Sequence, residues 1–190
     1  KKIQKLIVAQ HKNESQIEGL LRKAEANGVF DLETLDANQL KKLEPSVHGS
    51  TALLSPSTGI IDSHSYMQSL LLGAQANGAE FYPKTRINKA EALQNGFRVH
   101  TVIDEQKSPQ NYSFFCRQFI NSCGINAQQL ARRIDGVDSK YIPGLHLCKG
   151  DYFSYSKNNP FSHLIYPLPE KNESGLGIHA TLDMGSQLRF

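Results

Sequence analysis

A short apolar run lies near the start of the chain, and apolar residues then recur at helical spacing. The run within residues 5–10 predicts a strand. After Asn13, which suits an N-cap, the spacing predicts a helix that ends at Asn27-Gly28. The apolar face of this helix is formed by Ile17, Leu20, Leu21 and Ala24.

Two further elements follow before the next long helix. Asp36 is expected to cap a short helix that ends before Pro45, with Gln39 at the capping-box position. Residues 52–54 predict a strand, and the serines, proline and glycine at 55–59 predict a turn after it.

A third helix is expected with Asp62 or Ser63 as its cap and with Asn77-Gly78 at its end. Its predicted inner stripe is Tyr66, Met67, Leu70, Leu71 and Ala74. Strands and helices that alternate in this way predict a mixed α/β fold of the α+β class.

The middle of the chain is rich in strand patterns. Residues 85–92, 96–103 and 112–116 alternate as expected for an antiparallel meander. Residues 118–124 predict a short strand that ends in small residues, and residues 127–134 predict a helix directly after it. A cofactor can lie against backbone in such a turn, although an ordinary connection between strand and helix has the same pattern.

The last third predicts strands at 147–155, 164–167 and 176–183. In the last of these, Ile178, Ala180 and Leu182 alternate with His179, Thr181 and Asp183, so an imidazole, a hydroxyl and a carboxylate share one face. Such a face suits an active site, and a solvated edge strand is the alternative. Gly175 and Gly177 lie at the start of this strand, and the third glycine of a dinucleotide fingerprint is missing.

Composition narrows the class of protein. The 190 residues carry a net charge of +3, and the basic residues are dispersed, which gives no indication of nucleic-acid binding. The three cysteines, Cys116, Cys123 and Cys148, have no C-x-x-C spacing. They argue against a disulfide framework or a metal site and favour a reducing, cytoplasmic compartment. No apolar run has the ~20 residues of a transmembrane span.

The chain starts at Lys1 and enters a strand pattern at once, without a signal peptide. We therefore expect it to be a segment of a longer protein. No low-complexity linker divides the sequence, so we expect any domains to interleave.

Four motifs resemble the FAD-dependent L-2-hydroxyglutarate dehydrogenase/oxidase family of the D-amino acid oxidase-like superfamily, and Gln187–Phe190 extends the resemblance to the end of the chain. The motifs are Ser-Pro-Ser-Thr-Gly-Ile-Ile-Asp at 55–62, Asn-Ser-Cys-Gly at 121–124, Lys-Gly-Asp-Tyr-Phe at 149–153, and Leu-Ile-Tyr-Pro-Leu-Pro at 164–169 with Gly-Leu-Gly-Ile-His-Ala-Thr-Leu-Asp at 175–183. The resemblance implies that residues 55–139 are part of an FAD-binding domain. Residues 1–54 and 140–190 would form a β-sheet substrate domain.

The family's N-terminal G-x-G-x-x-G fingerprint is absent from these residues. We therefore expect FAD to bind the parent protein and not this segment alone. Incomplete sheets also suggest self-association of the segment.

The resemblance implies oxidation of a 2-hydroxy acid, L-2-hydroxyglutarate, to the 2-keto acid with hydride transfer to FAD. His179 is the first candidate for the catalytic base, because imidazole titrates near neutral pH. His64 is the second candidate, and for it a capping role in Ser63-His64-Ser65 is the alternative.

Arg189 and Lys149 match family motifs and are the candidates to bind the substrate carboxylates. Arg132 and Arg133 are expected to face solvent instead. Tyr152, Tyr166 and Thr181 are candidates to donate hydroxyls, with core packing as the alternative for the tyrosines. The candidates to contact the flavin are Ser122, Cys123, Gly124 and Gly59.

Two alternative functions stay open. One is oxidation of amino acids, amines or glycerol phosphate within the same superfamily, and the other is a catalytically silent binding module. The parent enzyme would pass electrons to oxygen or a quinone, and it is expected in the cytoplasm or at the inner face of a membrane.

Overall fold

The computed structural model describes residues 1–103, 109–169 and 177–190. The chain divides into two compact units: unit 1 is Lys1–Ser69 with Gly150–Phe190, and unit 2 is Leu70–Lys149. Unit 1 is therefore built from two segments that flank unit 2 in the sequence. Among the described residues, unit 1 has a four-stranded sheet, a two-stranded pair and three buried clusters, whereas unit 2 has a single four-stranded sheet and one buried cluster.

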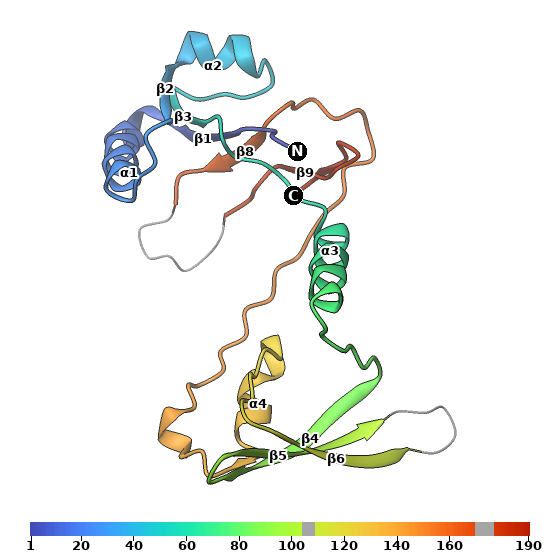
Figure 1. The fold of residues 1–190 in the computed structure, drawn as a ribbon. Coiled ribbons are helices and arrows are strands. Elements are labelled where there is room, and N and C mark those ends of the chain that lie inside the picture. The colour runs from blue at the N-terminus through green and yellow to red at the C-terminus, as the bar shows by residue number, and fades with distance from the viewer. Residues whose placement is uncertain (104–108, 170–176) are drawn as a thin grey trace. The chain divides into compact units, whose positions relative to one another are not determined.

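The main sheet of unit 1 has the strand order β2-β3-β1-β8 (Figure 1). Its strands are β1 Lys5–Ala9, β2 Glu33–Asp36, β3 Thr51–Ser55 and β8 Leu164–Pro167. β1 pairs antiparallel with β3 and parallel with β8, so the late segment 164–167 lies beside the first strand of the chain. The central strands carry the least exposed residues, Leu6, Ala52 and Leu53.

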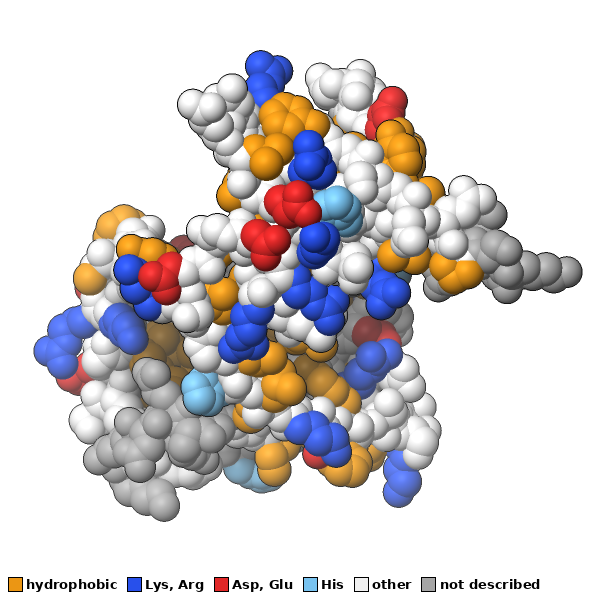
Figure 2. Space-filling view, turned by 90° about the horizontal axis from the view of Figure 1, so that it is seen from below, with side chains coloured by type: hydrophobic (Ala, Val, Ile, Leu, Met, Phe, Trp, Pro, Cys, Tyr) orange, Lys and Arg blue, Asp and Glu red, His pale blue; other side chains and the backbone are white. Residues whose placement is uncertain are grey.

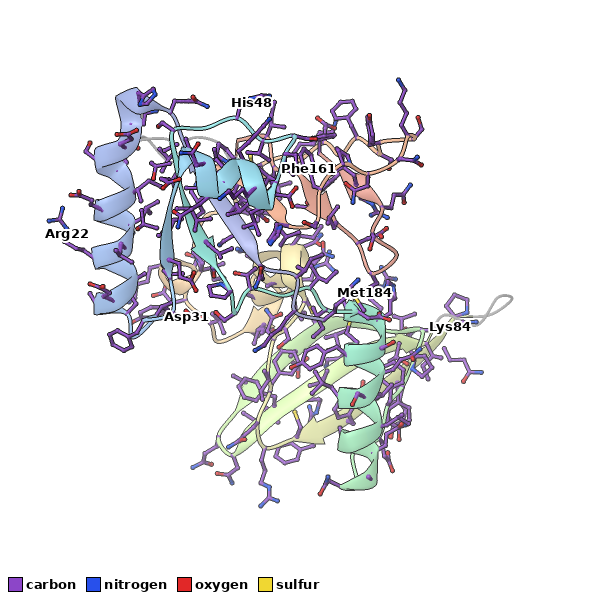
Figure 3. All side chains as sticks on the ribbon, turned by 90° about the horizontal axis from the view of Figure 1, so that it is seen from above. Arg22, Asp31, His48, Lys84, Phe161 and Met184 are labelled. Carbon is purple, nitrogen blue, oxygen red and sulfur yellow. The ribbon has the colours of Figure 1, made fainter. Side chains whose placement is uncertain are left out.

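Helices α1 (Glu14–Ala26) and α2 (Ala37–Leu43) pack against different apolar clusters of this sheet. Ile17 of α1 is buried in a cluster that contains Leu53, whereas Leu40 of α2 is buried in the cluster of Leu6. Figure 3 shows Arg22 on the outer side of α1, pointing away from the sheet. A 3-10 turn at His11–Asn13 precedes α1.

The predicted capping box of α2 is confirmed. The Asp36 carboxylate accepts the Gln39 backbone N–H at 2.8 Å, and the Gln39 side-chain oxygen accepts the Asp36 N–H at 2.9 Å. Both donors would otherwise be unpaired at the start of the helix, so the cap stabilises α2 locally.

The C-terminal part of unit 1 forms the short antiparallel pair β9 (Thr181–Leu182) and β10 (Leu188–Arg189). The strands predicted at 147–155 and 176–183 are wrong in extent, because only the bridge at Ser154 and the pairing from Ala180 onward are found there. Gly175 and Leu176 lie outside the described residues. A buried cluster of Leu164, Ala180, Leu182 and Leu188 holds this part together.

Helix α3 (Ser63–Ala76) contains the boundary between the two units. Asp62 is its cap, since its carboxylate accepts the Ser65 backbone N–H at 3.0 Å. The predicted inner stripe is wrong: no residue of α3 is buried in the structure. Its apolar side chains are exposed, among them Tyr66, Met67, Leu70 and Leu72.

Unit 2 contains the predicted antiparallel meander, extended by a short parallel strand to the order β6-β5-β4-β7. The strands are β4 Thr85–Leu93, β5 Gly96–Ile103, β6 Gln110–Cys116 and β7 Ile134–Asp135. The remaining helices are α4 Ala127–Ala131 and the 3-10 turns Gly124–Asn126 and Ser139–Tyr141. Ala90, Val99 and Ile134 form the buried cluster.

Two local predictions in unit 2 are wrong. Residues 118–124 form no strand, and the helix predicted at 127–134 ends at Ala131. Ile134 instead joins β7 in register with Ala90, and the Ala90 N–H donates to the Arg133 carbonyl at 3.1 Å. Pairing with β4 therefore ends the helix early.

The surface is mixed in character. On the face drawn in Figure 2, lysine and arginine side chains lie among acidic and apolar ones and do not form a single basic patch. In the described part of the chain, no helix is long and apolar enough to cross a membrane.

Candidate functional site

His179 lies just before β9 and beside β8. Ala180 and Ile165 exchange two backbone hydrogen bonds of 2.9 Å, which fix this segment against β8. The His179 ring stacks on Tyr166, with 4.0 Å between the ring centroids and 20° between the planes. Two of the predicted site residues are therefore in direct contact, and both are half-buried.

Lys5 also contacts Tyr166 and forms a cluster with Tyr166 and His179, although the sequence pattern did not predict it. The parallel register aligns Lys5 with Leu164, so Lys5 shares a sheet face with Tyr166, two residues further along β8. Its Nζ lies 5.5 Å from the centroid of the Tyr166 ring, within the range of a cation–π contact. The available signal was a single charged residue in the otherwise apolar strand Lys5–Ala9.

Thr181 and Arg189 lie opposite each other in the β9–β10 pair. The neighbouring pair Leu182 and Leu188 is buried, so Thr181 and Arg189 point to the other, more polar face. The Thr181 hydroxyl donates to the Arg189 carbonyl at 3.2 Å. Of the predicted polar row, the strand pairing therefore places Thr181 on a polar face, whereas Ile178, expected on the apolar face, is 79% exposed.

Asp183 organises the turn between β9 and β10. Its carboxylate accepts the backbone N–H groups of Gln187 and Gly185, each at 2.9 Å, and pairs with the Arg189 guanidinium at 3.1 Å. The Gln187 hydrogen bond is the main cause that lowers the pKa of Asp183 from its usual value, with Gly185 and Arg189 acting in the same direction. Arg189 is therefore already paired with one carboxylate.

Two other predicted site residues of unit 1, Tyr152 and His64, have no described contact with His179 or Tyr166. Tyr152 is 80% exposed, in the segment that pairs with the end of the chain through Phe153 and Phe190. His64 is exposed in the first turn of α3. Among the described residues, no hydrogen bond or ring contact joins His64 to the cluster around His179.

Gly59 has a structural explanation. It pairs with Lys2 across an isolated bridge, and a Cβ at this position would lie 2.8 Å from the Lys1 carbonyl oxygen. Only glycine permits this close approach of two backbones.

Ser122, Cys123 and Gly124 form an exposed turn in unit 2. Asn121 shapes it: its side chain donates to the Ala127 carbonyl at 2.7 Å and accepts the Cys123 N–H at 3.3 Å. Gly124 has a φ of 54°, and no atom lies within 4 Å of where a Cβ would be. The open backbone fits the close approach of a cofactor.

A pocket of about 520 Å³ adjoins this turn. It is lined by Thr85, Arg86, Ile87, Cys123, Asn126, Gln129, Leu130 and Arg133. Lys149, a predicted substrate ligand, is also a residue of unit 2. The predicted flavin contacts other than Gly59 thus belong to unit 2, and the predicted base belongs to unit 1.

A buried polar network in unit 1 was not predicted. The Glu44 side chain is 1% exposed in area, and its Oε1 accepts the backbone N–H groups of Ser162 and His163 at 2.7 and 2.8 Å. The same oxygen lies 2.6 Å from His163 Nδ1, and His163 Nε2 lies 2.9 Å from the Gln4 side-chain oxygen. His163 is thus a structural residue that joins α2 to the start of β8.

Within the described residues, no group of three histidine, cysteine or acidic side chains could hold a metal ion. The titratable residues instead form pairs and hydrogen-bonded networks such as those of Asp183 and Glu44.

Comparison with solved structures establishes the class of fold. L-proline dehydrogenase from P. horikoshii matches with a TM-score of 0.70 and 12% identity, covering 100% of this chain and 48% of that chain. Glycine oxidase from Geobacillus kaustophilus matches with a TM-score of 0.67 and 14% identity, covering 100% and 46%. The chain therefore has the mixed α/β fold of the FAD-dependent oxidases, as predicted.

Sequence comparison identifies the family. Residues 1–190 match the family described as FAD dependent oxidoreductase (DAO), and the chain belongs to this family. L-2-hydroxyglutarate dehydrogenase, mitochondrial, of Arabidopsis thaliana is 31% identical over 216 residues, covering 100% of this chain and 44% of that protein. L-2-hydroxyglutarate dehydrogenase of Escherichia coli K12 is 26% identical, covering 93% and 40%. The chain spans less than half of the length of these relatives.

Proposed function

We propose that the protein containing this chain oxidises L-2-hydroxyglutarate to the corresponding 2-keto acid, with FAD as the hydride acceptor. The proposal is carried by one observation: the whole chain is similar to relatives named L-2-hydroxyglutarate dehydrogenase. The contact between His179 and Tyr166 supports it, because an imidazole on a polar sheet face suits the chemistry of a 2-hydroxy acid.

His179 is the proposed catalytic base. A ring nitrogen of His179 would take the proton of the substrate hydroxyl while the hydride leaves C2. Stacking on Tyr166 restricts the imidazole to one plane, so the ring is held before the substrate arrives. His64 remains the second candidate, although its exposed place at the start of α3 favours a surface role.

The hydroxyls of Tyr166, Tyr152 and Thr181 are the proposed donors to the substrate. Arg189 and Lys149 are the proposed cations for its carboxylates. Because one side of the Arg189 guanidinium already donates to Asp183, only its other N–H groups would be available to the substrate.

FAD, when bound, would supply the acceptor for the hydride. Ser122, Cys123 and Gly124 are proposed to let the cofactor approach the backbone, with Gly59 as a further contact. The open space at Gly124 supports this role, whereas the position of Gly59 against Lys1 already accounts for that glycine.

The domain assignment also remains a proposal: residues 55–139 in the FAD-binding domain, and residues 1–54 and 140–190 in the substrate domain. The division of the chain after Ser69 and after Lys149 supports two interleaved parts. We further propose oxygen or a quinone as the electron acceptor, and a cytoplasmic location or one at the inner face of a membrane.

The test is a substrate panel with the full-length, flavin-loaded protein. We expect oxidation of L-2-hydroxyglutarate and no turnover of the D-enantiomer, glycine, proline or glycerol phosphate. Turnover of an amino acid in place of the hydroxy acid would overturn the proposal. A flavin-loaded protein that oxidises none of these compounds would favour a silent binding module.

A further inference from the structure

Lys5 is a half-buried cation within the cluster that contains the proposed base. It lies at the start of β1, and Tyr166 lies on the neighbouring strand β8. The Tyr166 ring contacts both Lys5 and His179, with 5.5 Å to the Lys5 Nζ and 4.0 Å to the imidazole centroid. The same phenol ring is therefore in contact with an ammonium group and with an imidazole.

Lys5 and Arg189 differ in whether a carboxylate of the described residues pairs with them. Arg189 pairs with the Asp183 carboxylate at 3.1 Å. In the ranges that the structure describes, no carboxylate lies within ion-pair distance of the Lys5 Nζ. A partly desolvated ammonium without a carboxylate attracts an anionic ligand more strongly than one that is already paired.

From this arrangement we infer that Lys5 binds a carboxylate of the substrate, and that it is the main cation of the substrate site. The inference rests on the proposed oxidation of a 2-hydroxy acid. Lys5 would then hold the substrate at a carboxylate, while His179 acts at its hydroxyl. Lys5 therefore selects for acids over neutral alcohols of the same shape.

The experiment uses the full-length, flavin-loaded protein with Lys5→Met, Lys5→Arg and the control Lys23→Met. Lys23 is an exposed lysine in the last turn of α1. We expect Lys5→Met to raise the KM for L-2-hydroxyglutarate by roughly 10- to 100-fold, the range for loss of a charged hydrogen bond, with a smaller change in kcat. Lys5→Arg should recover most of the loss, and Lys23→Met should leave the KM unchanged.

A binding measurement separates this inference from the proposed function. Glutarate, a dicarboxylate that lacks the reacting hydroxyl, should raise the melting temperature of the wild-type protein and of Lys23→Met, and not that of Lys5→Met. If the wild type oxidises no 2-hydroxy acid, the proposed function fails, and the glutarate measurement still decides the role of Lys5.

Comparison with L-2-hydroxypentanoate, which lacks the second carboxylate, identifies the bound group. A KM increase in Lys5→Met for both acids indicates the carboxylate beside the hydroxyl, and an increase for L-2-hydroxyglutarate alone indicates the distal one. Either result supports the inference. An unchanged KM together with unchanged stabilisation by glutarate in Lys5→Met would overturn it.

Discussion

The side chain on which the proposed chemistry depends most is His179. Its imidazole is held by stacking on Tyr166, and two hydrogen bonds of the following residue, Ala180, fix its backbone to β8. This arrangement restrains the orientation of the imidazole before the substrate binds.

We predict that His179→Ala lowers the turnover of L-2-hydroxyglutarate by roughly 10²–10⁴-fold, the usual contribution of a general base, in full-length protein that retains its flavin. Turnover and flavin content are measured on the same preparation. His48→Ala, at an exposed histidine of unit 1, is the matched control and should retain wild-type turnover. Near-wild-type turnover in His179→Ala would assign the base to another residue.

Single residues could be predicted from the sequence only where a short local pattern places them. The predicted alternation is found at Thr181 and Leu182, which pair with Arg189 and Leu188, and it fails at Ile178, which is exposed. Lys5 was missed because its contact with Tyr166 depends on the pairing of β1 with β8, which no local pattern encodes. The network of Glu44 and His163 was missed for the same reason, since these residues are 119 positions apart.

At the scale of elements, the β9–β10 pair depends on one carboxylate. Asp183 holds the turn through Gln187 and Gly185 and also pairs with Arg189. Because the folded state lowers the pKa of Asp183, its stabilising effect is present above the usual aspartate pKa. The effect is lost as the pH falls through the lowered pKa of the folded state.

We therefore predict that the Gln187 amide signal in NMR spectra of the full-length protein titrates with a midpoint below the usual aspartate value of about 3.9. In Asp183→Asn the acid transition of this signal should disappear, because the titrating group is gone. Asp31→Asn, at an exposed aspartate before β2, should leave the transition in place. A midpoint at the ordinary value would contradict the role assigned to Asp183.

The second prediction for an element concerns the attachment of α2 to β8. Glu44→Ala should lower the free energy of unfolding by about 1–3 kcal/mol, because His163 and the backbone at Ser162 would lose their buried acceptor. Denaturant unfolding measures this change. Glu25→Ala, at an exposed position of α1, is the control. A loss below about 0.5 kcal/mol, within the range of ordinary surface changes, would show that the network adds little stability.

Helices and strands could be predicted where the residues that define them lie close together in the sequence. The cap formed by Asp36 and Gln39 and the antiparallel meander follow from local sequence. β2 was not predicted, because Leu35 is its only apolar residue and pairing with β3 establishes the strand. The helix after Asn126 was predicted too long, because pairing of Ile134 with Ala90 outweighs the helical pattern.

At the scale of the whole molecule, many large apolar side chains are exposed among the described residues. No residue of α3 is buried. β6 is an edge strand, and Tyr112, Phe114 and Phe115 on it are 59%, 41% and 55% exposed. Exposed edges and apolar surface of this kind favour association with further polypeptide.

We predict that the 190-residue segment, produced alone, self-associates at micromolar concentration and contains no stoichiometric FAD. Sedimentation velocity and the flavin absorbance band measure the two properties. Phe114→Lys should weaken the association, because a charge on an edge strand opposes pairing. A monomeric segment, or a yellow preparation with one FAD per chain, would contradict this prediction.

The proposed reaction is the removal of a hydride from C2 of L-2-hydroxyglutarate by the full-length protein, with His179 as the proposed base. Anaerobic titration of the full-length, flavin-loaded protein tests it most directly, because bleaching of the flavin band reports the transfer without an added electron acceptor. We expect L-2-hydroxyglutarate to bleach the band stoichiometrically, and His179→Ala to slow bleaching by roughly 10²–10⁴-fold. A flavin band that L-2-hydroxyglutarate leaves unchanged, while glycine or proline bleaches it, would overturn the proposed reaction.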